Sequence, residues 1–127
     1  MRRGDIPDDV RRFILTSIPS VPYLEAVLLL RSEPQTRWHA RTLASRLYVP
    51  ERQGAELLAN LAAAGIAAGA AEDGYSYQPA TGELRERIEA LARTYSANLV
   101  GVTDLIHSRI EKRAHQFADA FRFRKDE

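Results

Sequence analysis

Apolar residues recur three and four positions apart along much of this chain of 127 residues, which is the spacing of one face of an α-helix. The first such stripe runs from Val10 to Ile18 and ends at Pro19. A second helix is predicted from Val21 to Ser32, because Ser20 can cap its start and Pro34 follows its end. This second helix is the most apolar one, so we expect it to form the centre of the core.

Two further helices are predicted to meet at a tight turn. Leu43, Ala44, Leu47 and Val49 form the apolar stripe of the first, and Ala44 is small enough to let another helix cross closely. The second spans Glu51–Ala64, because Pro50 suits a helix start and Gly65 suits the residue that follows a helix end. The turn between them is Leu47–Pro50.

The helical spacing then gives way to a hairpin pattern. The run Ile66–Ala71 leads to Glu72-Asp73-Gly74, where glycine can adopt the positive φ of a tight turn. Tyr75-Ser76-Tyr77 follows with the alternation of a strand. These residues predict a short β-hairpin.

The last third of the chain has no proline after Pro79 and a long helical stripe. Its apolar positions are Leu84, Ile88, Leu91, Tyr95, Leu99, Val102, Ile106 and Ile110. Their average spacing of about 3.7 residues suits a straight helix stripe better than a coiled coil. Tyr95–Asn98 and Gly101 are weaker helix formers, so both one helix and two helices are compatible with the pattern.

The order helix, turn, helix, hairpin, with Trp38 just ahead of the first helix, resembles the winged helix-turn-helix superfamily of bacterial transcriptional regulators. The resemblance covers Val21 to Pro79 and rests on order and spacing. It implies a mainly α fold with a small β-hairpin wing, a winged helix-turn-helix followed by C-terminal helices. Two residues depart from the family pattern. Tyr48 occupies a turn position where glycine is frequent, and His39 stands where a Ser, Thr or Asp cap is expected.

Three regions follow from this interpretation: an N-terminal helix in residues 1–20, a winged helix-turn-helix domain in 21–79, and a C-terminal helical extension in 80–127. The stripe of the extension must be buried against something. In many dimeric regulators of the superfamily a C-terminal helix pairs with a second copy, so we expect a homodimer. The expected dimer interface comprises Leu84, Ile88, Leu91, Tyr95, Val102 and Ile106. The alternative is an intramolecular layer against Val10–Ile18.

Composition narrows the protein class. Apolar residues make up 45% and charged residues 28% of the chain, its net charge is +1, and it has no cysteine. The absence of cysteine excludes disulfides, thiol catalysis and sulfur-ligated metals. No apolar run approaches the roughly 20 residues of a membrane span, and no signal segment follows the first residues. We therefore expect a cytoplasmic protein without a membrane partner.

Charge complicates the DNA-binding role that the resemblance implies. Between Glu51 and Ala80 there is one basic residue, Arg52, against four acidic ones, and such a surface opposes approach to phosphates. Arg52 could read guanine and Gln53 adenine, while arginines before them compensate the acids. The predicted contacts with double-stranded DNA are Arg37, Arg41, Arg46, Arg52 and Gln53.

The expected function is that of a DNA-binding transcriptional regulator. The alternative is a winged-helix module that binds another transcription or signalling protein without contacting DNA. The lack of positive charge on the predicted helix Glu51–Ala64 favours this alternative, as does the flat, alanine-rich segment Ala62–Ala71.

Catalysis and cofactors are not expected. Asp104, His107, Glu111 and His115 share one helical face, but the first and last would lie about 16 Å apart along the axis, so one ion could take only a neighbouring pair. A solvated polar face explains this row, and no phosphate-binding loop or catalytic motif occurs. We expect a non-enzyme without metal or cofactor.

The tail contains Phe117, Phe121 and Phe123. Such side chains are usually buried, so we expect the tail to pack on a helical layer of the same chain or of a partner. The alternative is a basic, aromatic arm that recognises another macromolecule.

Overall fold

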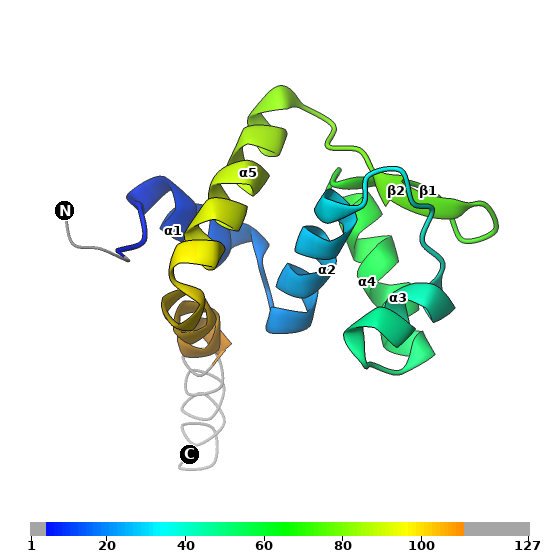
Figure 1. Cartoon of the computed structure of the whole chain (residues 1–127), viewed down its shortest axis with the longest axis horizontal. Coiled ribbons are helices and arrows are strands. Elements are labelled where there is room, and N and C mark those ends of the chain that lie inside the picture. Colours follow the sequence, from blue (N-terminus) through cyan, green and yellow to red (C-terminus); the bar gives the residue numbers. More distant parts are fainter. Residues whose placement is uncertain (1–4, 111–127) are drawn as a thin grey trace, which may run out of the picture. The chain divides into compact units, whose positions relative to one another are not determined.

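A computed structural model describes residues 5–110. These residues form a mainly helical protein with one two-stranded antiparallel sheet, as the sequence predicts (Figure 1). The elements are α1 (Asp8–Ser17), α2 (Val21–Ser32), α3 (Ala40–Leu47), α4 (Glu51–Ala63), β1 (Ala67–Ala70), β2 (Gly74–Tyr77) and α5 (Gly82–Ala97), and residues 99–110 form a further helix. Each boundary lies within a few residues of its predicted position.

The chain divides into two units, which we describe separately. The first is residues 22–92, which contain α2 to β2 and the first part of α5. The second joins the two ends of the chain, and its described part is residues 5–21 and 93–110.

The core of the first unit is built on α2. This helix buries Tyr23, Leu24, Ala26, Val27 and Leu30, because its apolar residues cover more than one face. The other buried hydrophobic residues of this unit are Trp38, Leu43, Ala44, Leu57, Leu58, Leu61, Ile66, Ala67, Ile88 and Leu91.

Helices α3 and α4 lie side by side and pack closely (Figure 1). The contact depends on Gly54 of α4. A Cβ atom placed there would lie 2.5 Å from the carbonyl oxygen of Ala40 and 3.1 Å from the Cβ of Ala44. Ala44 therefore permits a close crossing, as predicted, but Gly54 makes the larger contribution to it.

The hairpin pairs Ala67 with Tyr77 and Ala70 with Gly74, so residues 71–73 form its loop. Gly74 has a φ of 89°, which confirms the predicted positive-φ turn glycine. Trp38 adds a short third segment to this sheet. Its N–H donates to the carbonyl of Tyr75 at 2.6 Å, and its carbonyl accepts from the Tyr75 N–H at 2.8 Å.

In the second unit, α1 buries Val10, Phe13 and Ile14. Ile18, Val102 and Ile106 are also buried, and Arg109 donates to the carbonyl of Ile18 at 3.1 Å. Of the stripe positions in this unit, Val102 and Ile106 are thus buried within one chain, whereas Leu99 and Ile110 are exposed.

Within the described residues, the C-terminal segment forms two helices, and the sequence had left both one and two helices open. The break lies at Asn98, whose side-chain oxygen accepts from the Gly101 N–H at 2.9 Å. Asn98 therefore caps the helix at 99–110. Upstream, the Thr81 hydroxyl accepts from the Leu84 N–H at 3.0 Å and caps α5 in the same way.

Four of the six residues expected at a dimer interface have no exposed surface in the single chain: Ile88, Leu91, Val102 and Ile106. Leu84 and Tyr95 are half-buried. A partner could reach the four buried residues only if the chain opened. These four residues are therefore buried without a partner chain, and the homodimer itself stays a prediction.

Within residues 5–110, no single helix has both the length and the apolar composition needed to cross a membrane.

Candidate nucleic-acid interface

The turn between α3 and α4 is Tyr48–Pro50. Its backbone is held by a hydrogen bond from the Val49 N–H to the carbonyl of Ala44 at 3.0 Å. Tyr48 has a φ of 58°, and no other non-glycine residue in the described chain has a positive φ. The position thus has the left-handed conformation that makes glycine frequent there, and the tyrosine side chain is 95% exposed.

The first turn of α3 is stabilised by a side chain inside the helix, and not by a Ser, Thr or Asp side chain at the N-cap position. His39 is the N-cap residue, and its backbone N–H donates to the hydroxyl of Thr42 at 3.0 Å. Thr42 therefore stabilises the first turn from within the helix, which is the reciprocal half of a capping box. This bond explains how the helix begins without Ser, Thr or Asp at position 39.

The first turn of α4 presents Arg52 to solvent. The Arg52 side chain is 92% exposed, and its Nε atom lies 3.6 Å from a carboxylate oxygen of Glu56, one helical turn away. An exposed pair of this kind is weak, so Arg52 can leave Glu56 for a stronger acceptor. Gln53 is half-buried, with its N–H bonded to the carbonyl of Pro50 at 3.0 Å.

Arg37 and Arg41 lie on either side of the α3 start. Both are exposed, and neither forms a salt bridge with another residue in the described chain. Among the arginines predicted to contact DNA, these two have no carboxylate partner in the described chain that would compete with a phosphate.

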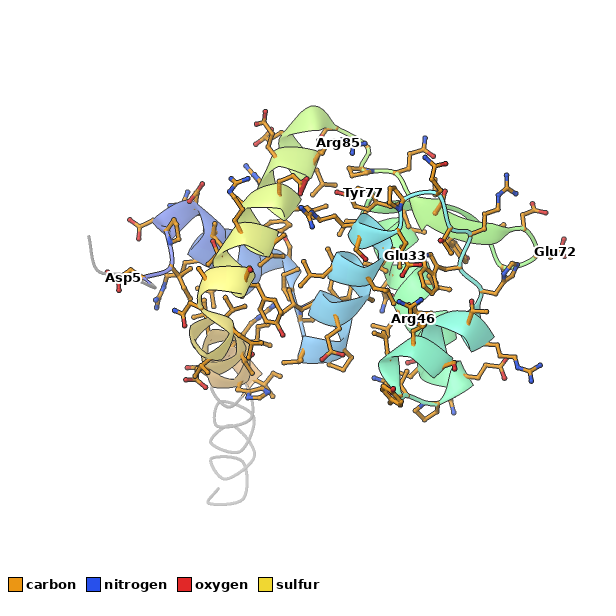
Figure 2. The ribbon with its side chains drawn as sticks, in the orientation of Figure 1. Asp5, Glu33, Arg46, Glu72, Tyr77 and Arg85 are labelled. Atoms are coloured by element: carbon orange, nitrogen blue, oxygen red, sulfur yellow. The ribbon has the colours of Figure 1, made fainter. Side chains whose placement is uncertain are left out.

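Arg46 differs from the other predicted contacts because it has two partners inside the same unit. One guanidinium nitrogen lies 2.7 Å from a carboxylate oxygen of Glu33, and Figure 2 shows the two side chains meeting. The guanidinium carbon also lies 5.5 Å from the centroid of the Trp38 ring, within range of a cation–π interaction. Arg46 thus links α3 to the loop after α2.

A pocket of about 360 Å³ opens beside this link. It is lined by Glu33, Thr36, Arg37, Trp38, Thr42, Ser45 and Arg46. The Nε1 atom of Trp38 is buried and has no hydrogen-bond partner among the described residues. Sequence analysis missed the pocket because it joins the loop after α2 to α3, which no spacing rule connects.

Acidic residues occupy the tip of the hairpin. Glu72 and Asp73 are exposed in its loop, and Figure 2 shows Glu72 at the far end. This tip repels phosphates, so it is poorly suited to lie along a DNA backbone.

A second cluster holds α5 to the rest of the first unit. Arg31 of α2 forms a salt bridge with Glu89 of α5, and the Arg85 guanidinium carbon lies 5.6 Å from the Tyr77 ring centroid (Figure 2). Burial raises the pKa of Tyr77, opposed by Arg85 and Arg31 and reinforced by Glu89. These contacts join α2, β2 and α5. They account for the attachment of α5, so no binding role is needed to explain these side chains.

The predicted polar row is only partly described. Asp104 and His107 are exposed on the helix at 99–110, whereas Glu111, His115 and the phenylalanine tail lie outside the described residues. Within residues 5–110, no three His, Asp or Glu side chains are grouped so that they could hold a metal ion.

No protein-family model matches this chain, and neither a curated protein nor a solved structure matches it at a significant level.

Proposed function

We propose that this protein is a winged helix-turn-helix transcriptional regulator that binds double-stranded DNA. The observation that carries the proposal is the pair α3 and α4, joined by a turn with a left-handed residue and followed by an antiparallel hairpin. The third sheet segment at Trp38 supports it further, because it ties the start of α3 to the hairpin.

In this proposal Arg37 and Arg41 contact phosphates, and Arg52 with Gln53 faces base edges. Arg37 and Arg41 are suited to phosphates because no described carboxylate neutralises them. Arg46 is set aside as a primary contact, since Glu33 already neutralises its charge. The acidic hairpin tip stays away from the backbone, so the interface is centred on the two helices.

The test is selection of genomic DNA fragments by the purified protein, followed by anisotropy measurements on the best fragment. Arg52→Ala should weaken binding to that fragment by about 1–3 kcal/mol while leaving binding to unrelated DNA almost unchanged. Arg87→Ala is the matched control, because Arg87 lies on α5 and pairs with Glu83. A folded protein that binds no fragment near 50 mM salt would overturn the proposal.

A second candidate function is protein recognition by the same two helices. The observation that favours it is the 95% exposed ring of Tyr48, since aromatic side chains are typical anchors of protein interfaces. The partner would be another transcription or signalling protein. In that case Tyr48→Ala should abolish crosslinking to the partner in cells, whereas Arg52→Ala should leave it intact; the opposite pattern would count against this function.

A further inference from the structure

The side of α4 that faces away from the core carries two long side chains and otherwise alanine. The residues that the helix buries are Gly54, Leu57, Leu58 and Leu61. At about 3.6 residues per turn, the opposite side of the helix, which we call the outer row, consists of Arg52, Glu56, Ala59 and Ala63, all of them exposed. Arg52 and Glu56 are therefore the two side chains of the outer row that extend beyond a methyl group. The alanines leave room for another surface to approach the helix closely.

Glu56 places a negative charge in the middle of this row. Its side chain is 63% exposed, and the ion pair that it forms among the described residues is the one with Arg52, at 3.6 Å. An exposed pair of this kind contributes little to stability, so the fold does not require a carboxylate at this position. Close to DNA, the phosphates repel a carboxylate and its desolvation is unfavourable unless a hydrogen-bond donor meets it. A DNA site for α4 must therefore offer Glu56 a donor on a base.

We propose that Glu56 determines the DNA sequence specificity of α4 by reading a cytosine in the major groove, next to the guanine read by Arg52. This inference rests on the proposed function. The N4 amino group of cytosine is a donor that a carboxylate can accept. Adenine also presents an amino group in the major groove, but its N7 acceptor lies beside that group and repels a carboxylate. Cytosine is thus the base that matches Glu56 best.

The spacing of the two residues limits where the cytosine lies. Arg52 and Glu56 are four residues apart, which corresponds to about 6 Å along the helix axis. Base pairs are stacked about 3.4 Å apart, so the cytosine and the guanine should lie within about two base pairs of each other. The same contact explains the acidic character of the helix, because Glu56 lowers the affinity for DNA in general and raises the selectivity for one sequence.

The test begins with selection from a randomised library of double-stranded DNA by the full chain. Anisotropy is then measured with the selected duplex and with duplexes that differ from it at one base pair. For the unmutated chain, replacement of the selected cytosine should weaken binding about tenfold. Glu56→Gln should change the preferred base at this position from cytosine to adenine, because an amide both donates to N7 and accepts from the N6 amino group. The preference for guanine at the neighbouring position should stay.

Glu51→Gln is the matched control. It removes the same charge from the same helix, but Glu51 is the first residue of α4 and lies outside the outer row. This variant should strengthen binding to all duplexes to a similar degree, since it reduces repulsion from the phosphates, and it should keep the cytosine preference. Thermal midpoints of both variants establish that they are folded.

The inference is overturned if Glu56→Gln keeps the cytosine preference, or if the selected site has no cytosine at the predicted spacing from the guanine. Both results would leave DNA binding itself intact. Loss of the guanine preference in Glu56→Gln, without a change from cytosine to adenine, would show that Glu56 only positions Arg52, and this also overturns the inference. If the unmutated chain binds no duplex, the proposed function fails and this inference fails with it.

Discussion

Tyr48, in the turn between α3 and α4, has a left-handed backbone conformation that is unfavourable for a non-glycine residue. A non-glycine residue in the left-handed region costs about 1–2 kcal/mol, and here the side chain recovers little of it because 95% of its surface is exposed. Nothing in the packing of the unit therefore requires a tyrosine at this position. This makes the ring a candidate for an intermolecular contact.

Tyr48→Gly should raise the thermal midpoint by a few degrees. Glycine removes the backbone strain, and the gain exceeds the roughly 0.5–1 kcal/mol that its greater freedom costs in the unfolded chain. Differential scanning calorimetry measures the change. Tyr48→Ala is the control, since it removes the ring but keeps the Cβ, and its midpoint should change little. A clearly lower midpoint for the alanine variant would show that the ring is needed for packing, and a lower midpoint for the glycine variant alone would contradict the backbone strain.

Among the elements, α3 and α4 form the contact on which the proposed interface rests. Gly54 lets the α4 backbone approach Ala40 and Ala44 of α3, so the relative position of Arg41 and Arg52 depends on a residue that carries no charge. A side chain at position 54 would push the two helices apart.

Gly54→Ala should destabilise the protein by about 2 kcal/mol, because the added Cβ would lie 2.5 Å from a backbone oxygen and the packing cost is therefore at the upper end of its usual range. Overpacking against the Ala40 carbonyl costs about 1–3 kcal/mol, and the higher helix propensity of alanine returns about 1 kcal/mol at most. Urea unfolding measures the difference. The matched control is Gly82→Ala at the start of α5, where an added Cβ meets nothing within 4 Å, and it should be neutral or slightly stabilising. Equal midpoints for both variants would contradict the close packing.

The elements themselves were predictable because each is specified by nearby residues. Apolar spacing placed α1 to α4, Gly65 ended α4, and Gly74 placed the hairpin turn. The pairing of Trp38 with Tyr75 and the contact of Glu33 with Arg46 were missed. Both join residues far apart in sequence, and local periodicity carries no information about such pairs.

Within the candidate site, sequence analysis identified the exposed arginines but could not tell which were already neutralised. Arg41 and Arg46 both lie on α3 with no acidic residue within four positions along the chain, yet only Arg46 meets a carboxylate among the described residues. The folded arrangement decides this, because the loop after α2 brings Glu33 to α3.

At the scale of the whole molecule, the question is whether the apolar residues of the C-terminal segment belong to the core of one chain or to an interface between two copies. Ile106 is fully buried in one chain, whereas its neighbour His107 is exposed on the same helix. The sequence alone left both a dimer and an intramolecular layer open, since an apolar stripe does not specify what covers it.

Ile106→Asp should unfold the second unit, because an unpaired charge in a core costs several kcal/mol. Circular dichroism should show a loss of helix, and His107→Asp, with the same added charge one residue away, should keep the native spectrum. The contrary outcome would be found by light scattering. If the unmutated protein is a dimer and Ile106→Asp is a folded monomer, Ile106 belongs to an interface between copies.

The central claim, that Arg37 and Arg41 hold DNA phosphates, is tested most directly by the salt dependence of binding. The logarithm of the association constant should fall linearly with the logarithm of salt concentration, and the slope counts the neutralised phosphates. Arg37→Ala and Arg41→Ala should each reduce the magnitude of that slope by about 1, and Arg87→Ala should not change it. Slopes that stay the same in all three variants, or an absence of DNA binding at low salt, would contradict the claim.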